Sequence, residues 1–146
     1  MNQLRAETPD EMLALGATAA ATAKPGDVFA LVGTLGTGKT HWSKGFISAM
    51  HPGSVATSPT FPIVNEYRND GMPVFHFDFY RLKSADELIA LGWDEYLDED
   101  GILICEWADL FPDIIPHDAT WLEITHQADG SRLIRETNRP HAGGQS

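Results

Sequence analysis

The sequence predicts an α/β fold in which a mixed, mainly parallel sheet is flanked by helices to give three layers. Two short apolar runs, residues 27–32 (DVFALV) and 102–105 (ILIC), have the length and composition of buried parallel strands. Helix-start signals alternate with strand-like segments, and a glycine-rich loop follows the first run. We expect a single domain over residues 1–139 and a frayed, disordered tail over residues 140–146.

The first half of the chain contains the elements around that loop. Thr8-Pro9-Asp10-Glu11 combines a cap, a proline and first-turn acids, which predicts a helix running to about residue 23. The strand at 27–32 and the loop at 33–38 follow, and residues 39–50 have a helical pattern. Residues 51–62 contain three prolines and are expected to form a connecting loop.

The second half continues the alternation. Residues 63–68 and 73–79 are predicted strands joined by a hairpin-type turn. Ser84 is expected to cap the next helix, with Glu87 completing a capping box. The strand at 102–105 comes next, and two more strands are predicted at 120–125 and 132–137.

The composition favours a folded, soluble, cytoplasmic protein. Ten Lys and Arg against 21 Asp and Glu give a formal net charge of −11, and 42% of the 146 residues are hydrophobic. The single cysteine, Cys105, excludes an internal disulfide and a Cys-rich zinc site. No membrane span and no secretory signal are expected. Such an acidic chain should repel nucleic acid unless its cations gather on one face.

The glycine-rich loop matches the Walker A pattern, with Gly33 and Gly38 at the two fixed glycine positions, followed by Lys39 and Thr40. Glycines allow the backbone to turn its N–H groups inward, and the following helix directs its own free N–H groups at an anion. We expect Lys39 to contact the β- and γ-phosphates and Thr40 to bind Mg²⁺. This predicts a P-loop NTPase-like sandwich. The predicted nucleotide-binding segment consists of Gly33, Thr34, Leu35, Gly36, Thr37, Gly38, Lys39, Thr40 and His41.

Two acids could serve the metal and the hydrolytic water. Glu106 follows the apolar run at 102–105, an arrangement like Walker B with Glu in place of Asp. Asp78 lies among aromatic residues, where a carboxylate should be paired or near metal, and a salt bridge to Arg81 is the equally weighted alternative. For Glu106 the alternative is a surface acid that ends a strand.

Two further features have both a functional and a plain interpretation. The segment at 58–62, which contains Thr60, could reach over the γ-phosphate as a switch loop, or simply connect two elements. Trp107 could stack on a base or cover the site, or belong to the core. The six histidines lack metal-site spacing, and the acidic run at 94–100 lacks the Ca²⁺-loop pattern and suggests a solvated or docking surface. No Asn-Lys-x-Asp motif is present, which argues against a GTPase.

Beyond the phosphate loop, four further motifs follow in a fixed order: SPTF at 58–61, VNEY at 64–67, HFDFYRL at 76–82 and EWA at 106–108. This combination, spread over residues 26–124, resembles the TsaE (YjeE) family, small bacterial ATPases of tRNA threonylcarbamoyladenosine synthesis. The resemblance implies ATP and Mg²⁺ as ligands. It also implies partners: TsaC makes threonylcarbamoyl-adenylate, TsaD with TsaB transfers the group to the adenosine 3′ of the anticodon, and TsaE binds the TsaB–TsaD pair to allow repeated cycles.

The resemblance implies that Lys39 binds phosphate and Thr40 binds Mg²⁺. It places Thr60 in the switch-like loop and Trp107 in the lining of the nucleotide site. Asp78 and Glu106 would serve the metal and the hydrolytic water. The resemblance leaves Arg132 and Arg135 without a role. Transfer RNA would be reached only through the partners, which agrees with the acidic balance, and the acids at 94–100 would be a docking surface for a basic partner.

Two other functions stay open from the sequence. A P-loop small-molecule kinase fits the length and the phosphate loop, although residues 111–120 contain no arginine for a lid. A non-hydrolysing, ATP-sensing adaptor would need only the binding half of the site.

Overall fold

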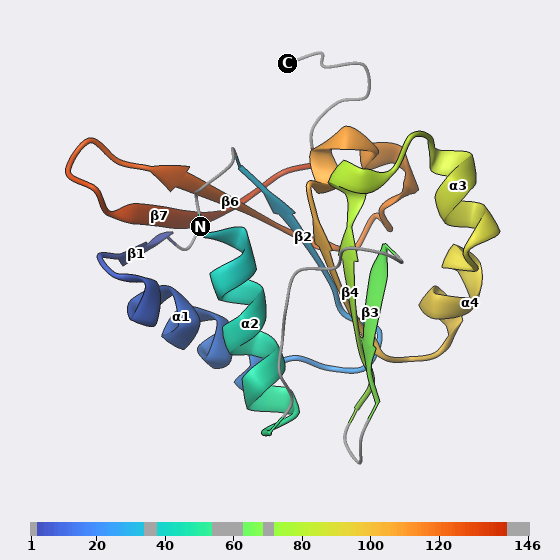
Figure 1. Ribbon diagram of the computed structural model, residues 1–146, viewed down its shortest axis with the longest axis horizontal. Coiled ribbons are helices and arrows are strands. Elements are labelled where there is room, and N and C mark those ends of the chain that lie inside the picture. Colours follow the sequence, from blue (N-terminus) through green and yellow to red (C-terminus); the bar gives the residue numbers. More distant parts are fainter. Residues whose placement is uncertain (1–2, 34–37, 54–62, 69–71, 140–146) are drawn as a thin grey trace.

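One mixed sheet lies between two helical layers in the computed structural model, which describes residues 3–33, 38–53, 63–68 and 72–139 (Figure 1). Within these residues the strand order is β1-β7-β6-β2-β5-β4-β3. The strands are β1 (Gln3–Ala6), β2 (Val28–Val32), β3 (Val64–Tyr67), β4 (Val74–Asp78), β5 (Ile102–Glu106), β6 (Thr120–His126) and β7 (Arg132–Thr137). The helices are α1 (Pro9–Ala21), α2 (Lys39–Met50), α3 (Ala85–Ala90) and α4 (Trp93–Asp98), with 3-10 turns at Phe79–Arg81, Ala108–Leu110 and Pro112–Ile114.

The centre of the sheet is parallel and its edges are antiparallel. Strand β2 pairs in parallel with both β5 and β6, and β4 pairs in parallel with β5. Strand β3 is antiparallel to β4, and β7 is antiparallel to β6 and β1. The predicted mixed, mainly parallel sheet is therefore confirmed.

The carboxyl ends of the parallel strands meet at one edge of the sheet, which is where ligands bind in open α/β sheets. Glu106 at the end of β5 is in register with Asp78 at the end of β4 and with Leu31 of β2. The glycine-rich loop leaves β2 at the same edge, so the register of the sheet brings the predicted acids to the loop.

Side chains alternate between two cores, one on each face of the sheet. On one face, Phe29 of β2 packs against Trp42 and Phe46 of α2. On the other face, Phe77 of β4 packs edge-on against Trp93 at the start of α4. Figure 1 shows α1 and α2 together on one side of the sheet and α3 and α4 on the other.

Helices α1 and α2 touch through two glycines, Gly16 and Gly45. A Cβ added at Gly16 would lie 2.0 Å from the carbonyl oxygen of Trp42, and one added at Gly45 would lie 1.9 Å from that of Leu13. The backbones are therefore in direct contact near the middle of both helices.

The structure corrects the predicted capping box. Thr8 caps α1 as expected, since its Oγ1 accepts a hydrogen bond from the Glu11 N–H at 3.1 Å. Ser84 occupies the cap position of α3, but its side chain makes no capping hydrogen bond. Glu87 instead accepts from the N–H of Lys83 at 2.8 Å, because that N–H, one residue further out, turns toward the helix.

Several elements were not predicted. Strand β1 is short and largely exposed, and it is held by pairing with β7, by the ion pair of Arg5 with Asp129 and by the buried side chain of Ala6. Helix α4 coincides with the acidic run that was predicted only as a surface. Cys105 is buried, as expected, and burial raises the pKa of its thiol. Within the described segments, no helix has the length and apolar character needed to cross a membrane. The predicted tail at 140–146 lies outside the described residues.

Candidate functional site

The phosphate-loop motif joins β2 to α2 as the sequence predicts. Gly33 ends the strand with φ 145°, and Gly38 caps the helix with φ 108°, a backbone conformation that side chains disfavour. A Cβ at Gly38 would also approach Met12 of α1 to 3.4 Å. Four predicted binding residues, Thr34, Leu35, Gly36 and Thr37, lie outside the described residues, as does Thr60.

The Lys39 side chain is almost fully buried at the start of α2. Its Nζ donates to the carbonyl oxygen of Gly33 at 2.7 Å and lies 4.1 Å from the ring centroid of Trp107. Burial lowers the pKa of Lys39, and the negative charges of Glu106, Asp109 and Asp78 oppose that shift. The ammonium therefore lies at the cavity, near three carboxylates. It contacts the Gly33 carbonyl and the face of the Trp107 ring, and an anion could replace both of these partners.

Glu106 connects the phosphate loop to the sheet. Its Oε1 accepts a hydrogen bond from the Thr40 hydroxyl at 3.2 Å, and its Oε2 lies 2.5 Å from Nε2 of His76. The side chain is 4% exposed, so it is not a surface acid that merely ends a strand. Lys39, Thr40 and Glu106 thus come together from two neighbouring elements.

Asp78 lies one strand away from Glu106 and has local partners. Its Oδ1 accepts from the N–H of Tyr80 at 3.1 Å, and its Oδ2 lies 3.5 Å from Nε of Arg81, the ion pair weighed from the sequence. Burial raises the pKa of Asp78, as does the charge of Glu106, whereas the Tyr80 hydrogen bond and Arg81 oppose the shift. Asp78 is not among the described residues that line the cavity. Its role on metal or water stays a prediction.

Trp107 follows Glu106 in a left-handed backbone conformation, with φ 61°. The conformation is uncommon for a bulky residue and turns the chain sharply away from the sheet. The indole ring packs against Tyr80, with ring centroids 4.8 Å apart, and against the Lys39 ammonium. Trp107 therefore forms the aromatic side of the site.

A cavity of about 430 Å³ opens over these residues. One wall consists of the predicted residues Gly38, Lys39, Thr40, His41, Glu106 and Trp107. The facing wall was not predicted: it comes from Ala6, Glu7, Thr8, Pro9 and Met12 at the junction of β1 and α1, and from Gly130 and Arg132 at the β6–β7 turn. The cap at Thr8 is predictable from the sequence, but no local signal places it at the site.

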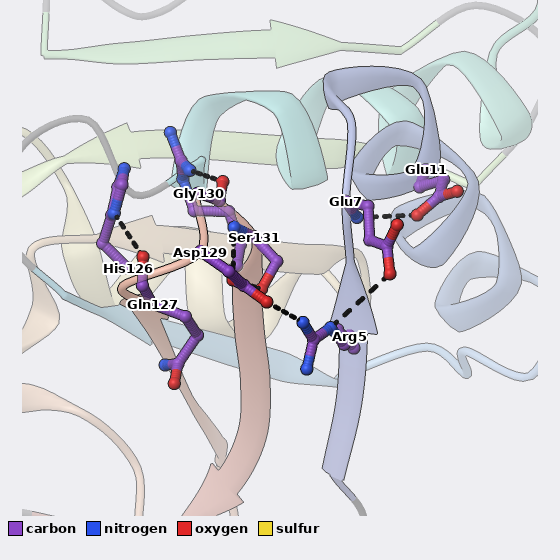
Figure 2. A network of polar contacts seen from close by, with 9 residues as sticks. Arg5, Glu7, Glu11, His126, Gln127, Asp129, Gly130 and Ser131 are labelled. Carbon is purple, nitrogen blue, oxygen red and sulfur yellow. Dashed lines mark hydrogen bonds and ion pairs between the residues drawn. The ribbon is translucent and has the colours of Figure 1, made fainter.

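Figure 2 shows the polar network that joins the two segments of the facing wall. Arg5 of β1 forms an ion pair with Asp129 of the β6–β7 turn, and its Nε lies 3.7 Å from Glu7. Asp129 in turn accepts hydrogen bonds from the N–H and the hydroxyl of Ser131 at 3.0 and 2.6 Å. The N–H of Glu7 donates to Glu11 at 2.6 Å. The turn and the start of α1 are thereby fixed to each other.

The two arginines without an assigned role differ in position. Arg132 lines the cavity, and its guanidinium donates to the carbonyl oxygen of Gly130 at 2.8 Å. Arg135 lies away from the cavity and pairs with Glu123 of β6 at 2.5 Å. Arg132 is thus a cavity residue, whereas Arg135 stabilises the β6–β7 pair.

His76 is the functional candidate that sequence reasoning missed inside the predicted strands. The spacing of the histidines does not select His76, because it does not match a metal site. The signal was strand periodicity: His76 precedes Asp78 by two residues, so both side chains lie on the face of β4 that also carries Glu106 in β5.

The donors present suit a magnesium ion that is shared with phosphate. The Thr40 hydroxyl and the Glu106 carboxylate offer the oxygen ligands that Mg²⁺ prefers. In the part of the chain that the structure describes, no group of three or more His, Cys, Asp or Glu could hold a metal by itself.

Comparisons with known proteins find relatives over most of the chain. A family model described as "Threonylcarbamoyl adenosine biosynthesis protein TsaE" matches residues 6–134. The chain is 40% identical to the tRNA threonylcarbamoyladenosine biosynthesis protein TsaE of Bacillus subtilis over 94% of this chain and 87% of that protein. It is 36% identical to the Haemophilus influenzae protein of the same name, over 74% of this chain and 70% of that protein.

The fold has a counterpart among solved structures. The crystal structure of Bacillus subtilis YdiB superimposes with a TM-score of 0.80 at 36% sequence identity. The match covers 94% of this chain and 85% of that chain, so the sheet and its flanking helices are shared almost throughout.

Proposed function

Because the chain belongs to the TsaE family, whose relatives are named for tRNA threonylcarbamoyladenosine biosynthesis, we propose that it binds ATP with Mg²⁺ and hydrolyses ATP weakly within that modification machinery. One observation carries the proposal: Lys39, Thr40 and Glu106 converge on one cavity where the parallel strands end. A cation and a hydroxyl at the start of a helix, with a buried carboxylate from the neighbouring strand, form the set that phosphoryl transfer needs.

The phosphates would lie on the α2 side of the cavity. The N–H groups of the first helical turn and the Lys39 ammonium would bind the phosphate oxygens, with the ammonium giving up the Gly33 carbonyl and the Trp107 ring. Thr40 and Glu106 would hold Mg²⁺, which neutralises charge on the phosphates when bound. A chance glycine-rich turn would not explain why these three side chains meet.

The nucleoside would lie against the facing wall. A volume of about 430 Å³ falls in the range of pockets for small molecules and cofactors. Met12 and Pro9 provide apolar surface, and Glu7 and Arg132 provide polar groups at the rim. These residues would bind the base and ribose and leave the phosphates to the opposite side.

The contacts of the catalytic candidates favour slow hydrolysis by the isolated chain. Both oxygens of Glu106 already have partners, Thr40 and His76, and these contacts assign the carboxylate to the metal ligand Thr40, so another group has to orient the hydrolytic water. Asp78, the second candidate for that task, is held by Tyr80 and Arg81. We assign activation to partner proteins that rearrange this region, in line with the TsaB–TsaD pair expected from the family, with TsaC in the same pathway. The net charge of −11 supports contact with tRNA only through those partners.

Lys39→Ala tests the nucleotide site, with Lys44→Ala as the matched control on the same helix. Calorimetry should show that Lys39→Ala weakens ATP binding by about 10- to 100-fold, the value of one charged hydrogen bond of about 1.5–3 kcal/mol, and abolishes hydrolysis. Lys44→Ala should match the parent, and circular dichroism should be the same for all three proteins. Unchanged ATP binding by Lys39→Ala would refute the site.

A second experiment separates the possible uses of ATP. Glu106→Gln should keep ATP binding and lose hydrolysis, both alone and with TsaB–TsaD. If the parent binds ATP and associates with TsaB–TsaD in a nucleotide-sensitive way but never hydrolyses it, the chain is an adaptor. If it phosphorylates a small acceptor instead, it is a kinase. A pull-down with TsaB and TsaD that does not respond to ATP would contradict the partner assignment.

A further inference from the structure

His76 is a buried polar residue beneath the site, in contact with it but outside the cavity wall. Its side chain is fully buried in β4, on the face that also carries Val74 of β4 and Ile104 of β5, two members of the apolar core. An imidazole in such surroundings is costly unless it is hydrogen-bonded. The residue therefore needs a physical reason beyond filling space.

The two ring nitrogens have different environments. Nε2 lies 2.5 Å from Oε2 of Glu106, whereas Nδ1 is buried and has no hydrogen-bond partner among the described residues. A buried N–H without an acceptor is more costly than a lone pair without a donor. The neutral tautomer with its proton on Nε2 satisfies both conditions, so His76 donates to Glu106.

This donation fixes how Glu106 meets the phosphate loop. With Oε2 taken by His76, Oε1 remains for the hydroxyl of Thr40, which donates at 3.2 Å. A hydroxyl that donates toward the sheet turns its lone pairs the other way, into the cavity that Thr40 lines. The chain His76–Glu106–Thr40 thus controls the direction of the oxygen that would face a cation.

We propose that His76 is a positioning residue that acts through Glu106: its Nε2–H fixes the carboxylate, and the carboxylate aims the Thr40 hydroxyl for a cation on the bound nucleotide. The inference rests on the proposed function for the identity of that ligand. The direction of the hydrogen bond from His76 to Glu106 does not depend on the proposed function, because this bond is present in the protein without nucleotide.

The hydrogen-bond direction can be measured on the parent protein alone. Long-range ¹H–¹⁵N spectra of the nucleotide-free, ¹⁵N-labelled chain report which nitrogen of each histidine carries the proton. We expect the Nε2–H tautomer at His76. A proton on Nδ1 in place of Nε2 would overturn the inference, whether or not the protein binds ATP.

Two substitutions of His76 differ in the position of their amide nitrogen. The side-chain nitrogen of glutamine takes the place of Nε2, and that of asparagine takes the place of Nδ1. His76→Asn should therefore lower kcat and the affinity for Mn²⁺ in the presence of ADP by about 10-fold or more, as loss of a supporting partner does at metal sites. His76→Gln should recover most of both, and KM for ATP should change little in either variant.

The Glu106→Gln background completes the test. Because His76 acts through the carboxylate, adding His76→Asn to Glu106→Gln should cause no further loss of Mn²⁺ affinity, measured by electron paramagnetic resonance. Equal defects in the Asn and Gln variants, or the same fold loss in the Glu106→Gln background, would show a packing role instead. If neither the parent protein nor any variant binds nucleotide, the proposed function fails. The tautomer of His76 in the nucleotide-free protein would still decide the direction of its hydrogen bond to Glu106.

Discussion

Replacing Gly45 with alanine should force helices α1 and α2 apart. The added Cβ would lie 1.9 Å from the carbonyl oxygen of Leu13 and 2.7 Å from its carbonyl carbon, while real Cβ atoms essentially never come closer than 3.0 Å. The difference between 1.9 and 3.0 Å requires a local shift of about 1 Å. Both contacted atoms are backbone, so no side chain can rotate away.

The energetic consequence follows from the size of that shift. A gap of 0.5–1 Å removes about a quarter to a half of the dispersion energy of each contact it opens. Overpacking typically costs about 1–3 kcal/mol, and the gain in helix propensity from Gly to Ala returns about 1 kcal/mol. Because the obstruction is rigid, we expect the upper end of that cost, a net loss of about 2 kcal/mol and a fall in Tm of about 6 °C.

Urea unfolding followed by circular dichroism measures this loss. The matched control is Ser48→Ala, an exposed position of the same helix, which should change stability by less than about 0.5 kcal/mol. Since α2 begins at Lys39 and the start of α1 lines the cavity, Gly45→Ala should also weaken ATP binding relative to the control. A variant as stable as the parent, with the same dependence on urea, would refute the backbone contact.

Three other predictions concern charge. Asp78→Asn should stabilise the protein at neutral pH, because burial raises the pKa of Asp78 and so disfavours its charged form in the folded state. In the parent protein, the protonated carboxyl contributes its full stability below the unfolded pKa of about 3.9. This stability is lost as the pH rises through the folded pKa, whereas an asparagine stays neutral. Urea titrations should show the advantage shrinking toward pH 4, and a constant advantage would contradict the cause. Burial and a hydrogen bond to the Glu66 carboxylate raise the pKa of Tyr96 to about 12. The protonated phenol therefore contributes its full stability below about pH 10, and this stability is lost as the pH rises toward 12. Tyr96→Phe should remove the latest of the tyrosine steps in an absorbance titration, and loss of an earlier step would be evidence against it. Asp98→Lys on α4 should weaken TsaB–TsaD binding relative to Asp118→Lys, and equal binding of the two variants in a pull-down would exclude α4 as the docking face.

The α2 side of the site, where phosphate is proposed to bind, could be predicted because each signal is local. The glycines at 33 and 38 are demanded by the backbone of the loop itself, and Lys39 and Thr40 follow at fixed offsets. Glu106 could be placed because an apolar run of strand length ends immediately before it. These features need only the neighbouring residues to be recognised.

The facing wall could not be predicted because it depends on pairing between distant segments. Ala6 and Arg132 are brought opposite each other by the register of β1 with β7, and the short, exposed β1 carries no apolar pattern of its own. His76 poses a related problem. Its partner Glu106 lies on another strand, so only the register of the sheet distinguishes it from a histidine buried for packing.

The pairing of Ala6 with Arg132 also sets an order of events during synthesis. A nascent chain that has emerged as far as Trp107 contains every described residue of the α2 side of the cavity, but the facing wall still lacks the β6–β7 turn that forms the ion pair with Arg5. The two halves of the cavity are separated by a long loop closure, which is slow compared with local folding. The cavity proposed to bind the nucleoside therefore has both of its walls only after β7 has left the ribosome.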